Sequence, residues 1–297
     1  MKIATIAGRV HVQPDSQQAD GWVDVAHAVP GTASTLIELL ARGQHDALRA
    51  ATAHPATQPA SAPLETPLQP GQLIDCFAFE GHVRNARARR GQPVPAEWYA
   101  SPVWYRANPR GLVPPGGTVP FPADETEPDF ELELACVIGQ RVHSPSREQA
   151  ATAIFGYTLF NDWSARATQR EAMKVGLGPN PGKDFASSLG PVIVTADEFG
   201  DPANAELSAT VDGEEWCRAQ MSEARWDFPA LIAAIANGNE LLPGDVVCSG
   251  TFTNGCGLEH GRVLRDGQVV ELHEAHIGTL RGICGRAPPR DAFWKKP

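Results

Sequence analysis

The sequence predicts an α+β fold that is rich in β-strands and carries a small α/β unit at its N-terminus. Short apolar runs bounded by Gly and Pro outnumber the helical segments. Strands and helices do not alternate regularly, which disfavours a doubly wound parallel sheet. A proline-rich stretch in the first quarter of the chain separates two regions of different composition.

The first region, residues 1–70, is predicted to be a small N-terminal domain followed by a linker. Strand-like runs lie at Ile3–Ile6 and Trp22–Val25. Residues 34–43 combine a capping residue, an apolar face and a terminal glycine, which is typical of a helix. Prolines then recur among Ala, Thr and Gln, as in a linker or an extended segment that wraps the surface. These prolines are Pro55, Pro59, Pro63, Pro67 and Pro70.

The second region, residues 71–297, is predicted to form the larger domain. Its clearest strands are 130–138, 191–195, 206–211, 245–250 and 268–272. Hairpin turns are expected at Asp212-Gly213 and Asp266-Gly267. The helices expected here span 146–155, 161–174 and 228–237.

Composition excludes several classes of protein. The net charge of −10 and the lack of a basic run argue against nucleic acid or an anionic membrane as the partner. No apolar stretch approaches the ~18 residues of a membrane span, and the first apolar run is too short for a signal peptide. The six cysteines form no CxxC pair. They are interpreted as reduced thiols in a cytoplasmic protein.

Two glutamates stand out in the strand 130–138. Glu131 and Glu133 point to one side of it, whereas Phe130, Leu132 and Leu134 point to the other. Paired acidic residues on a strand are most often a solvated face. Here, however, the remaining residues are those of a core strand, and further polar residues follow about 30 positions later.

Those further residues lie in the segment 160–169. If it is helical, Asp162, Arg166 and Gln169 fall at i, i+4 and i+7 and share one face. Arg166 could instead form an ordinary salt bridge with Asp162. Lys183 follows in a segment of Gly, Pro and Asn that lacks the residues of a phosphate-binding loop. Carboxylates without His or Cys make an all-oxygen site, suited to Mg²⁺, Mn²⁺ or Ca²⁺ rather than Zn²⁺.

Taken in order, these stretches resemble the fumarylacetoacetate hydrolase family over roughly residues 71–285. The resemblance rests on Glu131-x-Glu133, Asn161-Asp162-x-Ser164-x-Arg166-x-x-Gln169, Gly182-Lys183-x-Phe185, Gly190-Pro191, Leu242-Pro243-Gly244-Asp245, Gly250-Thr251 and Ile277-Gly278-Thr279-Leu280. It implies a mixed β-roll catalytic domain, a homodimer, and a divalent metal held by Glu131, Glu133 and Asp162.

The resemblance also assigns residues outside the central motifs. Longer family members have a metal-binding aspartate seven residues before a catalytic histidine, and Asp75 and His82 have that spacing. Tyr105 is similar to a substrate-contacting residue, whereas Phe77 stands where tyrosine is common. The family's glutamate partner of the histidine is missing at both usual places, where this chain has Asn85 and Arg265. The candidates to replace it are Glu80, Glu97 and Glu259.

The expected function is metal-dependent hydrolysis of a carbon–carbon bond in a small β-diketo acid of the fumarylacetoacetate or acylpyruvate kind. His82 would be the base and Lys183 would stabilise the enolate, while Arg166, Gln169 and Thr251 would orient the substrate. A decarboxylase, isomerase or sugar-acid dehydratase that uses the same metal–enolate site is the alternative. A metal-binding scaffold without catalysis is a third interpretation, which would not need Lys183, Arg166 and Gln169.

Overall fold

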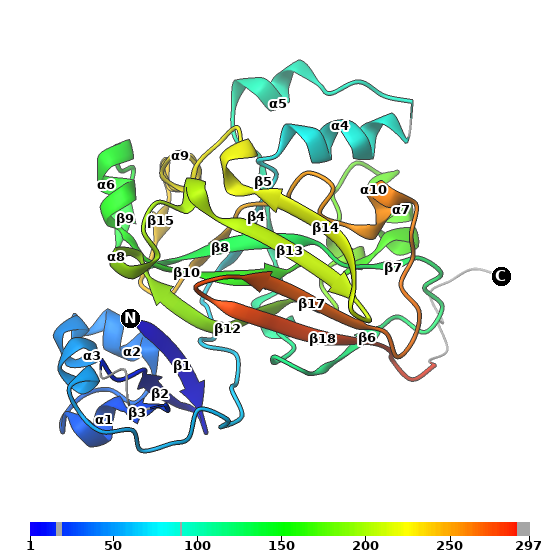
Figure 1. Cartoon of the computed structure of the whole chain (residues 1–297). Coiled ribbons are helices and arrows are strands. Elements are labelled where there is room, and N and C mark those ends of the chain that lie inside the picture. The colour runs from blue at the N-terminus through cyan, green and yellow to red at the C-terminus, as the bar shows by residue number, and fades with distance from the viewer. Residues whose placement is uncertain (16–19, 90, 290–297) are drawn as a thin grey trace.

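The computed structural model describes residues 1–15, 20–89 and 91–289 and is built on two large β-sheets (Figure 1). In the described residues the larger sheet has nine strands, which are antiparallel except for the pair β16 and β4. In spatial order they are β3 (Val23–Asp24), β2 (Arg9–Val12), β1 (Lys2–Ile6), β12 (Ser188–Thr195), β10 (Ile154–Asn161), β8 (Leu132–Ile138), β16 (Val246–Cys248), β4 (Leu73–Cys76) and β5 (Trp104–Ala107).

The second large sheet packs against the first. In spatial order its strands are β14 (Glu214–Gln220), β13 (Glu206–Val211), β17 (Val269–Glu274), β18 (Gly278–Arg286) and β6 (Thr118–Phe121). Two small strand pairs complete the β-structure, β7 (Pro128–Asp129) with β11 (Ser164–Ala165) and β9 (Val142–His143) with β15 (Glu240–Leu241). These sheets and the helices around them confirm the predicted α+β class.

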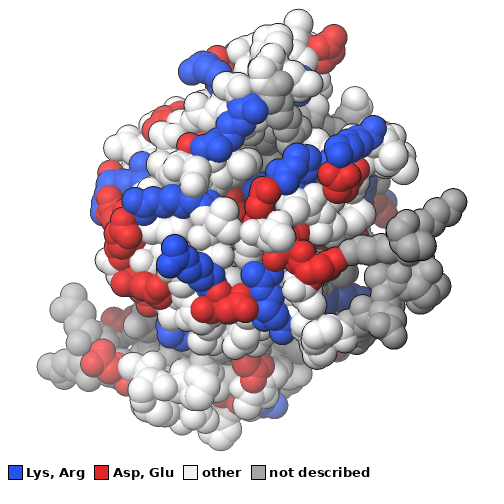
Figure 2. Space-filling view, turned by 90° about the vertical axis from the view of Figure 1, so that its right-hand side faces the viewer, with Lys and Arg blue, Asp and Glu red and all other residues white. Residues whose placement is uncertain are grey.

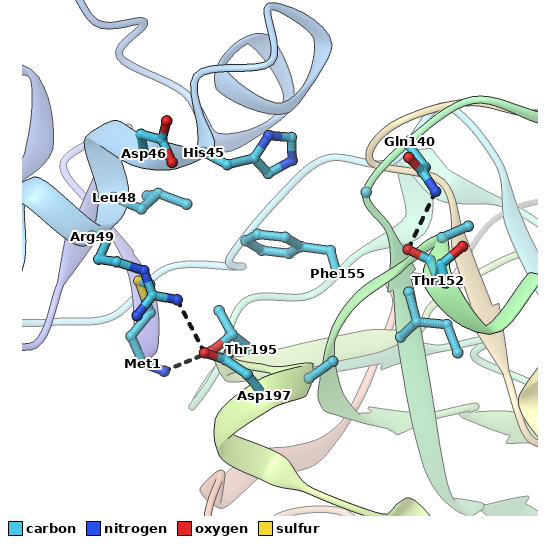
Figure 3. Close-up of a pocket in the computed structure, with 14 residues that line it drawn as sticks. Met1, His45, Asp46, Leu48, Arg49, Gln140, Thr152, Phe155, Thr195 and Asp197 are labelled. Carbon is cyan, nitrogen blue, oxygen red and sulfur yellow. Dashed lines mark hydrogen bonds and ion pairs between the residues drawn. The ribbon is translucent and has the colours of Figure 1, made fainter. Parts of the chain in front are cut away.

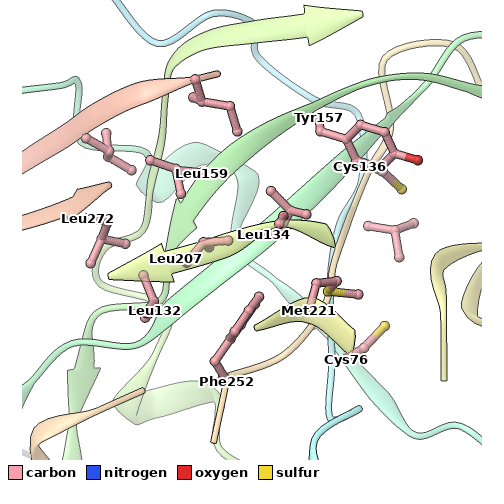
Figure 4. Packing of buried hydrophobic residues seen from close by; sticks show 14 of the residues in the cluster. Cys76, Leu132, Leu134, Cys136, Tyr157, Leu159, Leu207, Met221, Phe252 and Leu272 are labelled. Atoms are coloured by element: carbon pink, nitrogen blue, oxygen red, sulfur yellow. The ribbon is translucent and has the colours of Figure 1, made fainter. Parts of the chain in front are cut away.

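The main hydrophobic core lies between the two large sheets (Figure 4). Leu132 and Leu134 of β8 and Leu159 of β10 meet Leu207 of β13 and Leu272 of β17 there. Because side chains alternate along a strand, the side chains of Glu131 and Glu133 project from the opposite face of the sheet. The predicted division of this strand into an apolar face and an acidic face is therefore confirmed.

The helices lie around the sheets and at their edges. They are α1 (Val25–Ala28), α2 (Leu36–Ala41), α3 (His45–Thr52), α4 (Glu80–Ala88), α5 (Ala96–Ala100), α6 (Arg147–Thr152), α7 (Arg166–Met173), α8 (Ala196–Phe199), α9 (Phe228–Ile235) and α10 (Gly257–His260). Short 3₁₀ turns are η1 (Pro109–Gly111), η2 (Asn180–Gly182), η3 (Pro202–Asn204) and η4 (Met221–Glu223). No helix within the described residues has the length and apolar character needed to cross a membrane.

Two sequence predictions about local structure were wrong. The helix expected over 161–174 begins only at Arg166, because β10 runs through Asn161 and Ser164–Ala165 pairs with β7. The turn at Asp266-Gly267 leads into β17 but has no strand before it, and β17 instead forms a hairpin with β18. In contrast, Asp212-Gly213 joins β13 to β14 as predicted, with positive φ at both residues.

The N-terminal unit extends the large sheet, because β1 pairs with β12. The proline-rich stretch is an extended segment bonded to this unit: Gln58 accepts a hydrogen bond from Trp22 and Glu65 donates one to Thr5. Between α3 and the larger region lies a cavity of about 330 Å³, where Arg49 pairs with Asp197 (Figure 3). This cavity contains none of the predicted site residues.

The molecular surface carries charges of both signs. On the face shown in Figure 2, acidic and basic side chains are interspersed. This face therefore offers no continuous basic surface of the kind that binds nucleic acid.

Candidate active site

Four predicted metal ligands come together on the face of the large sheet that lies opposite the main core. Asp75 lies in β4, Glu133 lies in β8, Glu131 lies just before β8, and Asp162 follows β10. Each offers a carboxylate oxygen, and these atoms lie within 4.8 Å of one another. The sheet brings them together because β8 is bonded to both β10 and β16, and β16 is bonded to β4. All four side chains are buried.

Lys183 lies against this acidic cluster. Its ammonium group donates to Glu131 at 2.5 Å, to Ser164 Oγ at 2.7 Å, and to Asp162. Gly182 is required just before it, because a side chain there would collide with Gln169 of α7. The Gly182-Lys183 motif thus allows the η2 turn to pack on α7 and directs the lysine into the site.

Arg166 and Gln169 project from the first turns of α7. Arg166 NH1 lies 2.8 Å from Glu131 Oε1 and donates to Gln169 at 3.2 Å, while its Nε donates to Asp129 at 2.8 Å. Asp162 precedes the helix, so the prediction that it shares a helical face with Arg166 and Gln169 was wrong. Asp162 still reaches the site because it immediately follows β10.

Two other predicted substrate ligands contact the carboxylates directly. Tyr105 of β5 donates its hydroxyl hydrogen to Asp162 at 2.7 Å. Glu133 accepts a hydrogen bond from the backbone of Gly250 at 3.0 Å and lies 3.5 Å from Thr251 Oγ1. All of the predicted site residues therefore lie in one neighbourhood.

His82 has a buried glutamate partner. It lies in α4, and its Nδ1 is 2.8 Å from Glu259 Oε2. Gly81 allows α4 to lie close to the chain after Thr251, because any side chain at position 81 would collide with Thr253. Glu259 is one of the three glutamates that the sequence left open. The other two are excluded, since Glu80 pairs with Arg84 and Glu97 lies exposed on α5.

Several backbone and side-chain groups hold Glu259 in place. Asn85 donates to it at 2.9 Å and the backbone of Asn254 at 3.0 Å, while Cys256 Sγ lies 3.3 Å away. Burial by itself would raise the pKa of Glu259, but the hydrogen bond from His82 holds that pKa below its usual value. The asparagine at the family's glutamate position thus supports a glutamate from another part of the chain.

Burial changes the acidity of the carboxyls in the acidic cluster. It raises the pKa of Asp75 and Glu133 well above the usual range, and neighbouring carboxylates add to the effect. For Asp162, burial outweighs the attraction of Lys183 and raises its pKa to about 6. Glu131 is buried too, yet the charge of Lys183 holds its pKa well below the usual range. Protons, Lys183 and Arg166 therefore balance part of the charge.

The acidic cluster fits a divalent cation. Asp75 Oδ1 and Asp162 Oδ1 are buried and find no hydrogen-bond donor among the described residues. Buried polar atoms are normally paired, so two unpaired carboxylate oxygens within one acidic cluster indicate that a cation would fit there. Four carboxylates without nitrogen or sulfur suit a hard ion such as Mg²⁺, Mn²⁺ or Ca²⁺.

A cavity of about 270 Å³ connects these groups to the surface. It is lined by His82 and Lys183, by Asp75 and Glu131 of the acidic cluster, and by apolar side chains such as Phe77 and Trp104. Such a volume lies just below the range of roughly 300–1,000 Å³ that is typical of ligand pockets, so the site suits a small molecule.

Sequence reasoning missed Asp129. Its carboxylate binds Arg166 and accepts hydrogen bonds from the backbone of Gly257 at 2.8 Å and Leu258 at 3.0 Å, at the start of α10. It thus links the arginine to the helix that carries Glu259. The signal was present in the sequence, because Asp129 stands two residues before Glu131, but its strand neighbour β11 was mistaken for helix.

Comparisons with known proteins agree with this geometry. The model of the fumarylacetoacetate (FAA) hydrolase C-terminal domain matches residues 74–283. An oxaloacetate tautomerase from Bacillus subtilis is 32% identical over 158 residues, which are 53% of this chain and 52% of that protein. The aligned part therefore spans about half the length of that relative.

Two solved structures share the fold over nearly the whole chain. The fumarylacetoacetate hydrolase of Exiguobacterium antarcticum is 26% identical with a TM-score of 0.75, covering 96% of this chain and 98% of that one. The maleylpyruvate hydrolase of Sphingobium sp. SYK-6, solved with manganese(II) and pyruvate, is 24% identical with a TM-score of 0.75, covering 97% and 100%. With the family model matching most of the chain, this protein belongs to the fumarylacetoacetate hydrolase family, whose members include hydrolases and tautomerases.

Proposed function

We propose that this protein is a metal-dependent hydrolase that cleaves a carbon–carbon bond in a small β-diketo acid of the acylpyruvate or fumarylacetoacetate type. The observation that carries the proposal is the buried pair of His82 and Glu259, which lies beside the acidic cluster. Hydrolysis needs a base that activates water, and a carboxylate-oriented histidine is suited to that role. Without this pair, the site would favour reactions that need no water.

The metal in this proposal is Mg²⁺, with Mn²⁺ or Ca²⁺ as possible substitutes, held by Asp75, Glu131, Glu133 and Asp162. When bound, the ion would supply Lewis-acid polarisation of the substrate's oxygens. Arg166 and Gln169 would bind the carboxylate of the keto acid, and Thr251 and Tyr105 would orient its carbonyl groups. Each of these side chains lines the same cavity, which supports a shared role in binding.

The chain's own groups suffice to describe the proton transfers. With Nδ1 bonded to Glu259, Nε2 of His82 takes a proton from water, and the oxygen attacks the distal carbonyl carbon. The bond between that carbon and the methylene carbon then breaks, and its electron pair forms the enolate of the keto acid. Lys183 stabilises the developing negative charge by donating a hydrogen bond. Protonation of the enolate carbon completes one carboxylate and one 2-keto acid.

A second candidate keeps the enolate chemistry but omits the water. It is a tautomerase, isomerase or decarboxylase, and it is favoured by the 32% identity to an oxaloacetate tautomerase. Lys183 supports it as well, since Asp162 and Glu131 offset the effect of burial and raise the pKa of this ammonium group above its usual value. A protonated lysine can donate to an enolate oxygen in either reaction.

The proposed assembly is a cytoplasmic homodimer. The cytoplasmic assignment is supported by the cysteines, all six of which are free and buried. The proposal of a dimer is supported only by the resemblance to the family. Catalysis rather than a scaffold role is supported by Lys183, Arg166 and Gln169, which a metal-binding scaffold would not need beside the acidic cluster.

The variant His82→Ala separates the candidates. For a hydrolase, kcat on acetylpyruvate should fall roughly 10²–10⁴-fold, while metal affinity and melting temperature stay nearly unchanged. A tautomerase or decarboxylase should keep most of its activity on oxaloacetate. If His82 only packs in the core, stability and every activity should fall together. Acetylpyruvate hydrolysis at the wild-type rate in this variant would contradict the hydrolase mechanism.

A further inference from the structure

A second group of metal-binding residue types lies beside the acidic cluster, and its chemistry is different. The side chains of His82, Cys256 and Glu259 each offer one ligand atom, and these atoms lie within 4.8 Å of one another. All three side chains are buried. In the part of the chain that the structure describes, only this group and the acidic cluster bring three or more such residues together in this way.

The three ligand atoms gather around one oxygen of Glu259. Its Oε2 lies 2.8 Å from His82 Nδ1 and 3.3 Å from Cys256 Sγ. The other oxygen, Oε1, accepts hydrogen bonds from Asn85 and from the backbone of Asn254. Because Oε1 is anchored by these two donors, Oε2 is left facing the imidazole and the thiol.

The backbone around Cys256 fixes the position of the thiol. Cys256 pairs with Glu131 in an isolated antiparallel bridge, and the amide of Leu132 donates to the carbonyl oxygen of Gly255 at 2.9 Å. These bonds tie the segment to the strand that carries the acidic cluster. A ligand atom that is held in place before an ion binds lowers the entropy cost of binding.

This donor set suits a softer ion than the acidic cluster does. Thiolate and imidazole are ligands that Zn²⁺ prefers, whereas four carboxylates suit a hard ion such as Mg²⁺. One thiolate, one carboxylate and one neutral imidazole carry two negative charges, so a bound Zn²⁺ would leave the buried group neutral. Burial raises the pKa of the Cys256 thiol well above its usual value, and coordination to the ion would release the thiol proton.

The active-site cavity gives an ion access to this group. His82 lines the cavity, and so does Leu258, the residue next to Glu259 in α10. A water molecule from the cavity would complete a tetrahedral coordination with three protein ligands.

We propose that His82, Cys256 and Glu259 form a zinc site whose occupation blocks catalysis. Zn²⁺ binds Nδ1 of His82, Oε2 of Glu259 and the thiolate of Cys256, and one thiol proton is released. The neutral imidazole then carries its one proton on Nε2, so it cannot accept a proton from water. The binding site is argued from geometry alone, whereas the loss of activity rests on the function proposed for His82.

Zinc binding is measured on the whole chain at saturating Mg²⁺, by titration with ZnCl₂ in competition with a colorimetric zinc chelator. We expect one zinc ion per chain, and an X-ray absorption spectrum at the zinc edge with one sulfur neighbour at about 2.3 Å. Hydrolysis of acetylpyruvate should fall by roughly 10²–10⁴-fold at saturating zinc, the loss expected when a general base is removed. Excess Mg²⁺ should not restore the activity, whereas removal of zinc with the chelator should.

Two cysteine variants test the assignment of the ligand. Cys256→Ser should weaken zinc binding by more than the ~10–100-fold typical of an outer-shell change, because it removes a ligand. Cys284→Ser is the matched control, since Cys284 is also buried but lies in β18 of the second large sheet, and it should bind zinc as the wild type does. Inhibition is expressed relative to each variant's own rate with Mg²⁺ alone. The absorption spectrum is recorded on the wild-type protein, so it decides the question even if Cys256→Ser fails to fold.

The inference is overturned if no zinc binds in the presence of Mg²⁺, or if the zinc edge shows only oxygen and nitrogen neighbours. It is also overturned if excess Mg²⁺ relieves the inhibition or if Cys256→Ser binds zinc as tightly as the wild type, because zinc would then occupy the acidic cluster. Zinc bound to sulfur without loss of activity would refute the blocking role. The proposed function is tested separately with Mg²⁺ alone. If the zinc-free protein hydrolyses no acylpyruvate, the hydrolase proposal fails, whereas the spectrum still decides the zinc site.

Discussion

The variant Glu259→Gln tests the structural basis of hydrolysis most directly. Glu259 Oε1 accepts from Asn85 and from the backbone of Asn254, while Oε2 accepts from His82 Nδ1. An amide nitrogen cannot accept hydrogen bonds, so the glutamine oxygen must face the two asparagine donors. The amide NH₂ group then faces His82 Nδ1, which must become the acceptor. The imidazole proton moves to Nε2, and the base can no longer take a proton from water.

The size of this effect follows from the loss of the correct tautomer. An equivalent carboxylate-to-amide change beside a catalytic histidine costs up to about 10⁴-fold in kcat, so a loss of roughly 10²–10⁴-fold is expected here. That corresponds to about 3–5 kcal/mol of activation free energy. Glutamine has nearly the same shape, and only the weak Sγ–H donor of Cys256 loses its acceptor, so the melting temperature should change by no more than about 4 °C.

The assay follows the loss of enol absorbance of an acylpyruvate at saturating Mg²⁺ and substrate. Glu80→Gln is the matched control, because Glu80 lies on the same helix as His82 but binds Arg84 and Tyr99 instead. This control should keep its kcat. The reasoning is refuted if Glu259→Gln retains kcat within about threefold of the wild-type value, far from the loss expected for a wrong tautomer.

Three further predictions concern the metal, the buried charge and the assembly. EDTA should abolish activity and Mg²⁺ or Mn²⁺ should restore it, whereas full activity in metal-free protein would remove the metal from the mechanism. Glu133→Gln should weaken Mn²⁺ binding, measured by electron paramagnetic resonance, by more than the ~10–100-fold typical of an outer-shell change. Lys183→Met should destabilise the metal-free protein by about 3–5 kcal/mol, because it leaves Asp162 without its cation and Glu131 with Arg166 alone, and Mg²⁺ should reduce that loss. Urea titrations with EDTA or with Mg²⁺ measure both values, and an equal loss in the two conditions would count against shared charge compensation. Light scattering at micromolar concentration should give the mass of a dimer, and a monomer mass would contradict the expectation drawn from the family.

The parts of the fold that could be predicted from sequence are those with strong periodicity. The pattern of residues 130–138 predicts a buried strand because apolar and acidic residues alternate at its start. One face of β8 does lie in the main core, and Glu133 on the other face reaches the site, while Ala135 and Val137 on that face join a second apolar cluster. The segment 161–174 was misjudged for a related reason. Asp162, Arg166 and Gln169 fit a helical spacing by coincidence, whereas Trp163 is fully buried and donates to Ser188 of the neighbouring strand β12. Tertiary packing decided the conformation there, and local spacing did not.

The partner of His82 could not be predicted from local spacing for a different reason. Histidine and glutamate are 177 residues apart, and they meet only because α4 and α10 pack against each other. Asn85 marked the place where the usual glutamate is absent, yet nothing near it in sequence could say which of three glutamates replaces it. The sequence left Glu80, Glu97 and Glu259 open on equal terms, and only the packing of the chain shows that Glu80 pairs with Arg84 and that Glu97 is exposed.

The charge balance of the site affects both the stability of the protein and its affinity for a metal ion. Five buried carboxylates lie around two buried cations, and these residues are Asp75, Asp129, Glu131, Glu133, Asp162, Arg166 and Lys183. Buried charge without a partner costs several kcal/mol, so the excess of negative groups is tolerable only if protons or a cation offset it. In metal-free protein the raised pKa values of Asp75 and Glu133 mean that bound protons offset the excess negative charge. A divalent ion must displace those protons, so its affinity should rise with pH across the range in which they titrate. The same negative excess that would cost stability without a metal therefore favours the binding of a dication.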